Sequence, residues 1–166
     1  LIVTDKGISE ARLLENIQKS LQSEGINICV FDGVEAEPPA RAVNQSAQMA
    51  QNEACDIIIG VGGGSSLDVA KGASIMATNK GGILDYVGIN LVPKRGLPTI
   101  LIPTTSGTGS EVSRALIVTD ERDMTKRAIF SDFILANVAV VDPLLTLSLP
   151  QVITAETGID ALAHAI

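Results

Sequence analysis

The sequence predicts a Rossmann-like α/β fold, in which a mostly parallel sheet is flanked by helices. Short runs of β-branched residues alternate with segments whose apolar residues recur at helical spacing, which is typical of right-handed strand–helix–strand crossovers. Two of the runs, Ile57–Ile59 and Ile100–Ile102, are apolar at consecutive positions, as expected of strands covered on both faces. A length of 166 residues allows one such domain with a substantial core.

Helical spacing of apolar residues occurs in three segments between the strands. They span residues 8–21, 43–54 and 67–75. A fourth helical pattern starts at Gln151 and is expected to break at Gly158. The six predicted strands are Leu1–Thr4, Ile26–Phe31, Asp56–Val61, Thr99–Ile102, Ala115–Thr119 and Val138–Val141.

The alternation of strands and helices stops around residues 144–150, so we expect a domain boundary near residue 148. Residues 1–148 then form the α/β domain, with its first strand truncated. Residues 149–166 form the beginning of a helical second domain. The chain starts without Met in an apolar run and stops inside a helical pattern, so we expect both ends to be cut.

Composition excludes several classes of protein. A hydrophobic fraction of 46% with a net charge of −7 does not fit a disordered chain, and the acidic balance predicts no nucleic-acid partner. Two cysteines, Cys29 and Cys55, cannot make a disulfide framework or a four-thiolate zinc site. One histidine cannot complete a multi-histidine metal centre. With no apolar run of about 18 residues and no leader pattern, we expect no membrane partner and a cytoplasmic protein.

The first glycine-rich loop follows a buried strand and opens a helix. Four glycines fall within Gly60–Gly64, where a backbone without Cβ atoms can approach a phosphate closely and the helix N-terminus offers free N–H groups. The loop matches neither G-x-G-x-x-G nor the Walker A pattern. Ser65 and Asp68 have the spacing of a capping box. A plain strand-to-helix turn is the alternative to a phosphate-binding loop.

The second loop, Pro103–Glu111, also follows a buried strand and alternates hydroxyl side chains with glycines. Such a loop can bind phosphate, ribose or a nicotinamide amide. Thr108 and Glu111 again have capping-box spacing, so a capped helix without a ligand is the alternative. Two such loops after strands of one parallel sheet converge on its carboxyl edge, where open α/β sheets bind ligands.

Two charged residues lie where a nucleotide can meet them. Asp32 follows the second predicted strand, a place where an acidic residue commonly binds the adenosine ribose and repels a 2′-phosphate. This position favours NAD over NADP, although Asp32-Gly33 also reads as a simple turn. Lys126 can reach a phosphate or ribose, or it can be solvated surface.

Asp160 and His164 are spaced i, i+4 on the predicted terminal helix. This spacing places both side chains on one face, one turn apart. The pair suits two ligands of a divalent metal, and a hydrogen-bonded surface pair is the alternative.

Together these motifs resemble the iron-containing (group III) alcohol dehydrogenase family. The order and spacing of the motifs agree over nearly the whole chain. The segments that carry the resemblance are Phe31–Glu35, Gly62–Ser65 with Asp68–Lys71, Pro103–Thr105 with Gly107–Glu111, Asp142-Pro143 with Leu149-Pro150, and Thr157–Leu162 with His164-Ala165.

The resemblance implies a dinucleotide-binding α/β domain, similar to that of dehydroquinate synthase, followed by an all-helical metal-binding domain. It implies NAD as cofactor, Fe²⁺ or Zn²⁺ as metal in the intact protein, a small alcohol or aldehyde as substrate and a homo-oligomer. Asp160 and His164 match the first two metal ligands, and no further catalytic residue is implied. The implied cofactor-binding residues are Asp32 for the ribose, Gly63, Gly64 and Ser65 for the pyrophosphate, and Asp68, Thr104, Thr105, Thr108, Ser113 and Lys126 around the nicotinamide, its ribose and the rest of the cofactor.

One position departs from the family, because Glu37 stands where the family usually has Asn. With only two metal ligands, this chain alone is expected to be inactive and metal-free. Three alternatives stay open at this point: a dehydroquinate-synthase-like lyase that uses NAD without net redox change, a glycerol-dehydrogenase-like enzyme, and a non-enzymatic nucleotide-binding module.

Overall fold

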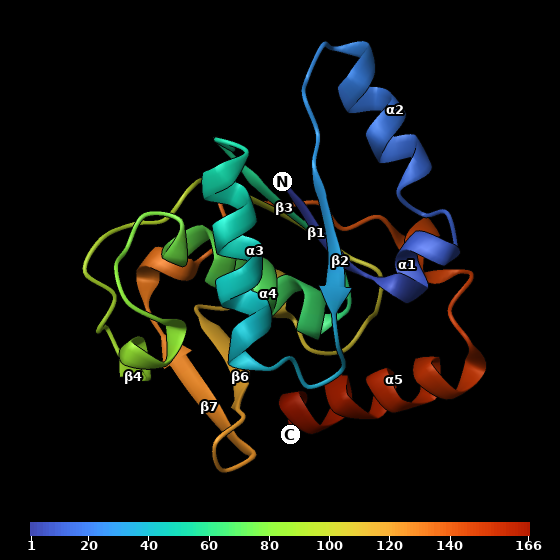
Figure 1. Cartoon of the computed structure of the whole chain (residues 1–166). Coiled ribbons are helices and arrows are strands. Elements are labelled where there is room, and N and C mark those ends of the chain that lie inside the picture. Colours follow the sequence, from blue (N-terminus) through green and yellow to red (C-terminus); the bar gives the residue numbers. More distant parts are fainter.

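A five-stranded sheet forms the centre of the molecule in a computed structural model that describes residues 1–166. The strand order is β2-β1-β3-β5-β8, and every pairing in this sheet is parallel. Figure 1 shows the strands directed toward α1 and α5, so the carboxyl edge faces these two helices. The strands are β1 (Ile2–Asp5), β2 (Val30–Val34), β3 (Ile58–Gly62), β5 (Thr99–Pro103) and β8 (Val138–Ala139).

Neighbouring residues of the central strands pack into two different cores. Ile58 belongs to the core on the side of helices α3 (Ala40–Asn52) and α4 (Gly64–Met76), and Ile59 belongs to the smaller core on the other side. Successive side chains of a strand point to opposite faces, so both layers draw on the same run of isoleucines. All five residues of β3 are buried, which agrees with the predicted two-sided burial.

The second face of the sheet is covered by two short helices. Helix α1 (Lys6–Glu10) and helix α2 (Glu15–Ser23) replace the single helix expected over residues 8–21. Arg12 has a left-handed φ of 58°, which ends the first helix. Within residues 6–23 only Leu14 is buried, and Ile8, Ile17 and Leu21 pack against the same core as partly buried residues. The far end of α2 projects beyond the rest of the molecule in Figure 1.

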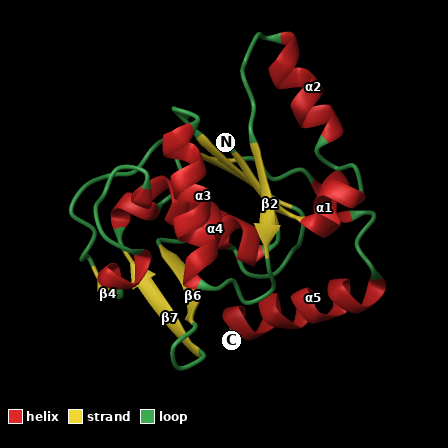
Figure 2. Cartoon of the chain, in the orientation of Figure 1, coloured by secondary structure: helices red, strands yellow, loops and turns green.

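A second sheet, separate from the first, was not expected (Figure 2). It contains β4 (Gly88–Ile89), β7 (Thr125–Phe130) and β6 (Ala115–Asp120). The prediction that residues 115–119 belong to the parallel sheet is wrong, because β6 pairs antiparallel with β7. The 3-10 turns are η1 (Ile83–Tyr86), η2 (Ser110–Val112), η3 (Asp132–Ile134) and η4 (Pro143–Thr146).

Two further expectations need correction. The second strand begins at Val30, four residues later than expected, because its pairing with β1 starts at Ile2↔Val30. Helix α5 (Gln151–Ala165) runs through Gly158 without a break, because a glycine costs only about 1 kcal/mol inside a helix. The expected boundary near residue 148 falls between η4 and α5 and stays a prediction.

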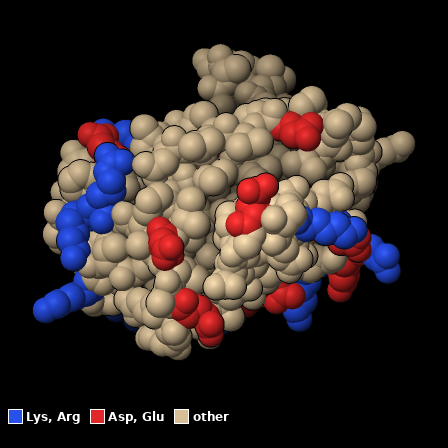
Figure 3. All heavy atoms as spheres, turned by 90° about the horizontal axis from the view of Figure 1, so that it is seen from above, with Lys and Arg blue, Asp and Glu red and all other residues tan.

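Charged groups are distributed unevenly on the surface. The face in Figure 3 is mainly uncharged, with Lys and Arg at its margins and single acidic groups between them. None of the helices combines the length and the apolar character that a membrane-spanning helix needs.

Candidate functional site

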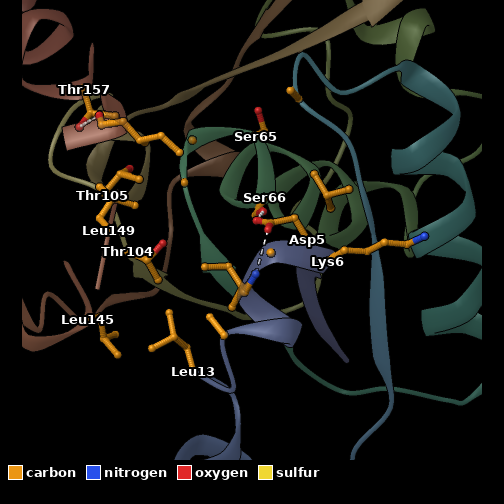
Figure 4. Close-up of a pocket in the computed structure, with 18 of the residues that line it drawn as sticks. Asp5, Lys6, Leu13, Ser65, Ser66, Thr104, Thr105, Leu145, Leu149 and Thr157 are labelled. Carbon is orange, nitrogen blue, oxygen red and sulfur yellow. Dashed lines mark hydrogen bonds between the residues drawn. The ribbon is translucent and has the colours of Figure 1, made fainter. Parts of the chain in front are cut away.

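A cavity of about 1010 Å³ lies at the carboxyl edge of the parallel sheet. Its walls come from the ends of β1, β2, β3 and β5, from α1, and from the segment 145–157 that leads into α5. Figure 4 shows side chains from these separate segments around one space. Seven of the predicted site residues line the cavity: Asp32, Gly63, Gly64, Ser65, Thr104, Thr105 and Thr108.

The first glycine-rich loop turns from β3 into α4 at the wall of this cavity. Gly62 has a φ of 143°, and a Cβ atom there would lie 2.7 Å from Ser66 Oγ, so both backbone conformation and space require glycine. Helix α4 begins after Gly63, and no side chain caps it. Its first N–H groups therefore have no side-chain acceptor within the protein, and its positive dipole end meets the cavity.

The capping box expected from Ser65 and Asp68 is not present. Ser65 lies inside α4, and the residue at the N-cap is Gly63. Asp68 accepts its hydrogen bonds on another side of the helix instead, from Ser110 Oγ at 2.6 Å and from the backbone N–H of Ile117 at 2.9 Å. The start of α4 is thus left open to an external anion.

The second loop packs directly on the first. The backbone N–H of Thr104 donates to the carbonyl of Gly62 at 3.0 Å. A Cβ atom on Gly64 would lie 2.7 Å from Thr108 Cγ2, so the two loops are in contact. The helix expected after Thr108 is only the three-residue turn η2, with Gly109 rather than Thr108 at its N-cap.

Helix α5 closes the cavity from the side of the second loop. Ile153 and Thr157 line the space, and a Cβ atom on Gly107 would lie 2.9 Å from Thr157 Cβ. Glycine at this position therefore allows α5 to approach the loop closely.

Asp5 lines the cavity as well, although it is not among the residues predicted from the sequence. Its Oδ1 accepts a hydrogen bond of 3.1 Å from the backbone N–H of Ile8, and its Oδ2 accepts one of 3.0 Å from Ser66 Oγ (Figure 4). Asp5 thereby caps α1 and joins it to the first turn of α4. An Asp between an apolar strand and a helical pattern is the signal that marks such a cap.

Asp32 lies within β2 rather than after it, with an exposed side chain at the cavity wall. Glu35 lines the same cavity, and its carboxylate is 2.6 Å from the guanidinium of Arg41. This end of the cavity therefore carries two carboxylates, one of them paired.

Three other predicted cofactor residues do not reach the cavity. Lys126 lies on β7, and its Nζ is 2.7 Å from Glu37 Oε1. Asp68, on α4, and Ser113 both contact the ammonium group of Lys71, on the side of α4 that does not line the cavity.

Lys71 is a fully buried cation, with 0% of its side chain exposed. Its Nζ donates to the carbonyl of Ala115 at 2.7 Å and to Ser113 Oγ at 3.2 Å, and lies 3.5 Å from Asp68 Oδ1. Burial raises the pKa of Asp68 and lowers the pKa of Lys71, against their mutual attraction. Together with Ser110, this cluster holds the second loop and β6 against α4.

Asp160 and His164 lie on one face of α5, as their spacing predicts. His164 Nε2 is 3.5 Å from Asp160 Oδ1; the His164 side chain is exposed and that of Asp160 is partly exposed. No group of three or more His, Cys, Asp or Glu residues is placed to hold a metal ion. The chain therefore offers one nitrogen and one carboxylate donor, which is half of a usual site.

Comparison with known proteins identifies the family. A model of iron-containing alcohol dehydrogenases matches residues 1–143. The chain belongs to the iron-containing alcohol dehydrogenase family. Long-chain-alcohol dehydrogenase 1 of Geobacillus thermodenitrificans is 43% identical to it, over 100% of this chain and 42% of that protein.

Solved structures of the family agree with the fold. The crystal structure of a 1,3-propanediol oxidoreductase matches with a TM-score of 0.95 at 39% identity, covering 99% of this chain and 43% of that one. The sulfoacetaldehyde reductase of Bifidobacterium kashiwanohense, solved in complex with NAD⁺, matches with a TM-score of 0.87 at 35% identity, with coverage of 99% and 43%. The Rossmann-like fold predicted from the sequence is thus confirmed, and the chain spans about two fifths of the length of these iron-containing alcohol dehydrogenases.

Proposed function

We propose that this chain is the NAD-binding part of a metal-dependent alcohol dehydrogenase that transfers hydride between a small alcohol and NAD. The observation that carries the proposal is the single cavity at the carboxyl edge. It brings Asp32, the uncapped start of α4 at Gly63–Ser65 and the hydroxyls of Thr104, Thr105 and Thr108 around one space. The order of these features along the sheet suits ribose, pyrophosphate and nicotinamide in turn.

The start of α4 is the proposed pyrophosphate site. Its unpaired N–H groups and positive dipole end attract an anion, and the absence of Cβ atoms on Gly63 and Gly64 lets the phosphates approach the backbone. The threonine hydroxyls of the second loop are placed to orient the nicotinamide and its ribose. The bound nicotinamide then supplies the hydride chemistry.

Selectivity for NAD over NADP is proposed to come from Asp32. A carboxylate here accepts hydrogen bonds from the ribose hydroxyls and repels a 2′-phosphate. Glu35 adds to the negative charge at this end of the cavity, although Arg41 partly offsets it. The NAD⁺ complex of the sulfoacetaldehyde reductase supports the same choice.

Asp68, Ser113 and Lys126 have partners within the protein in this structure. We propose that Asp68 and Ser113 serve the cofactor indirectly, by holding the second loop in place. A contact from Lys126 would require its ion pair with Glu37 to open, which links this lysine to the residue that departs from the family pattern.

Asp160 and His164 are the proposed metal ligands of this chain. Their donor atoms, one carboxylate oxygen and one imidazole nitrogen on one helix face, suit Fe²⁺ or Zn²⁺. A divalent ion held there and by further ligands outside this chain would lower the pKa of an alcohol. With two ligands only, the chain alone is expected to be inactive.

The substrate class is proposed to be a small alcohol or aldehyde. The names of two relatives specify small members of this class, 1,3-propanediol and sulfoacetaldehyde, whereas the name of a third specifies long-chain alcohols. The proposed boundary near residue 148 separates the α/β domain of residues 1–148 from the segment 149–166 that carries the metal ligands.

Calorimetric titration of the folded chain with NADH and NADPH tests the cofactor proposal. We expect NADH to bind with a Kd of about 1 mM or tighter, and NADPH at least tenfold more weakly. Asp32→Ala should lower the ratio of the Kd for NADPH to the Kd for NADH. Asp132→Ala, which removes an exposed carboxylate paired with Arg114, should leave this ratio unchanged. Absence of NADH binding at about 1 mM in a folded sample would contradict the proposal.

The reaction class has to be tested with an activity assay of the complete enzyme. An alcohol dehydrogenase produces NADH in proportion to the alcohol consumed, whereas a lyase of dehydroquinate-synthase type regenerates its NAD and accumulates none. Net NADH production from a panel of small alcohols supports the proposal, and turnover without NADH would replace it.

A further inference from the structure

We propose that Cys29 and Cys55 are a disulfide-forming thiol pair, oxidised by small disulfide compounds at a site remote from the dinucleotide cavity. They are the only cysteines of the chain, and their Sγ atoms are 3.4 Å apart. Cys29 directly precedes β2, and Cys55 lies in the segment that leads into β3. The pair is therefore at the amino ends of these strands, at the edge of the sheet opposite the cavity.

Both cysteines are held in place by backbone hydrogen bonds. The carbonyl of Cys29 accepts from the N–H of Ile2 at 2.9 Å. The N–H of Cys55 donates to the carbonyl of Ala50 at 2.8 Å. Ala54, directly before Cys55, has a left-handed φ of 50°. This is the usual way in which a helix ends with a reversal of the chain, and it turns Cys55 back toward Cys29.

The pair needs only a small movement to form a bond. A disulfide has an S–S distance of about 2.05 Å, so the two sulfur atoms have to approach by roughly 1.4 Å. Both cysteines lie outside the helices and strands. Rotation of their side chains and a slight shift of the two connecting segments can supply this movement without breaking a ladder of the sheet.

A second cavity gives small reagents access to the sulfurs. It has a volume of about 410 Å³ and is lined by both cysteines, by the turn at Gly25 and by the carboxylates of Glu53 and Asp56. The N-terminal ammonium of Leu1 lines the same cavity, but the two carboxylates outnumber it, and the net negative charge disfavours an anionic reagent. We therefore expect a small cationic disulfide such as cystamine to react faster than the anionic oxidised glutathione.

The reaction is a pair of thiol–disulfide exchanges. The thiolate of one cysteine attacks a sulfur of the small disulfide, which forms a mixed disulfide and releases one small thiolate. The other cysteine, as thiolate, then attacks the Sγ atom of the first cysteine in this mixed disulfide. The bond between Cys29 and Cys55 forms, and the second small thiolate leaves. The protons of the two cysteine thiols end on the two released thiols. Two electrons pass from the cysteine pair to the small disulfide.

The environment of Cys29 indicates a slow reaction. Burial and the hydrogen bond with Cys55 raise the pKa of the Cys29 thiol, so the reactive thiolate is scarce at neutral pH.

The cross-link would join the two ends of the segment that contains β2, with Asp32, and α3. A closed loop has fewer conformations when unfolded, which stabilises the folded state. The measurable effect is a higher Tm of the oxidised chain, by about 5 to 10 °C for a chain of this size.

The test incubates the folded chain with cystamine and, in parallel, with oxidised glutathione. We expect both free thiols to disappear, the mass to fall by that of two hydrogen atoms, and Tm to rise until a reductant reverses it. Cys29→Ser and Cys55→Ser should stop at a mixed disulfide and show no rise in Tm. Where either variant fails to fold, a linked peptide containing Cys29 and Cys55 from the unmodified sequence decides the same point.

Three results would overturn the proposal. They are two free thiols persisting in the folded chain, two small-molecule adducts on one chain, and a disulfide only between two chains. None of these outcomes bears on NADH binding, since the thiol pair and the dinucleotide cavity lie at opposite edges of the sheet.

Discussion

Gly64 and Thr108 are in such close contact that a Cβ atom on Gly64 would lie 2.7 Å from Thr108 Cγ2 and 2.9 Å from Thr108 Oγ1. Gly64 is the first residue of α4, and Thr108 belongs to the loop after β5. The contact joins the proposed pyrophosphate site to the proposed nicotinamide site. It makes the spacing of the two loops depend on the absence of one methyl group.

Gly64→Ala should therefore separate the loops and weaken NADH binding by about tenfold or more, which corresponds to about 1.4 kcal/mol. The second variant Thr108→Ala removes both atoms that clash and leaves Thr108 Cβ at 3.2 Å, so the double variant should recover part of the loss. Titration of the single and double variants with NADH measures this coupling. Gly158→Ala, with no atom near the added Cβ, is the matched control and should bind as the unmodified chain does.

Asp5 couples α1 to the start of α4 through its two carboxylate oxygens. Asp5→Ala removes the helix cap and the acceptor of Ser66, and should lower the free energy of unfolding by about 1 to 2 kcal/mol. Asp5→Asn keeps an oxygen for the N–H of Ile8, so its loss should be smaller. Urea denaturation of both variants checks the order, and equal losses would show that the cap is not the source of the effect.

The buried ammonium group of Lys71 supports the second loop from behind. Lys71→Met leaves the Asp68 carboxylate buried without its cation, which should cost about 3 kcal/mol of stability near neutral pH. Adding Asp68→Asn removes the unpaired charge and should restore part of this loss. The measurement is urea denaturation of the single and double variants, with NADH titration to show whether the loop has moved.

The same variant should have a characteristic pH dependence. Because burial already raises the pKa of Asp68, the folded state of Lys71→Met holds the Asp68 proton more tightly than the unfolded state does. Its stability should then increase as the pH falls from about 7 to about 5, relative to the unmodified chain. A constant difference between the two proteins over this range would contradict the buried-carboxylate explanation.

The contribution of Asp120 to stability should have the opposite pH dependence, in a lower pH range. Hydrogen bonds from the guanidinium of Arg122 lower the pKa of Asp120 from the ordinary 3.8 to about 2. Its contribution to stability is present above pH 3.8 and is lost as the pH falls toward 2. Asp120→Asn should therefore flatten the acid limb of the stability curve in this window. Asp132→Asn, at an exposed ion pair, should leave the limb unchanged.

Much of the α/β domain could be predicted because the central strands β3 and β5 contain apolar residues at consecutive positions. Residues 58–59 and 100–102 lie in β3 and β5 as expected, since burial on both faces accounts for consecutive aliphatic residues, whereas Ile57 precedes β3. The strand β7 could not be predicted, because Thr125, Lys126 and Arg127 carry no apolar pattern and are held by pairing with β6. Tertiary pairing, rather than local preference, forms that strand.

The candidate site was predictable where glycines and hydroxyls follow a buried strand. The role of Lys71 was not, because a lysine in a helix normally lies at the surface, and only the surrounding Val69, Ala70 and Ala73 hint at burial. The position of Asp68 depends on Ser110 and Ile117, which are distant in sequence. No local pattern could show that this carboxylate lies behind α4 rather than in the cavity.

Amide chemical-shift mapping of the isotope-labelled chain during titration with NADH shows whether the dinucleotide occupies the cavity at the carboxyl edge. We expect the largest shifts at three places: Asp32 and Gly33, Gly63–Ser66, and Thr104–Thr108. The amides around Cys29 and Cys55, at the opposite edge of the sheet, should not move. Saturable shifts confined to residues outside the cavity, or no shifts in a folded sample at about 1 mM NADH, would contradict it.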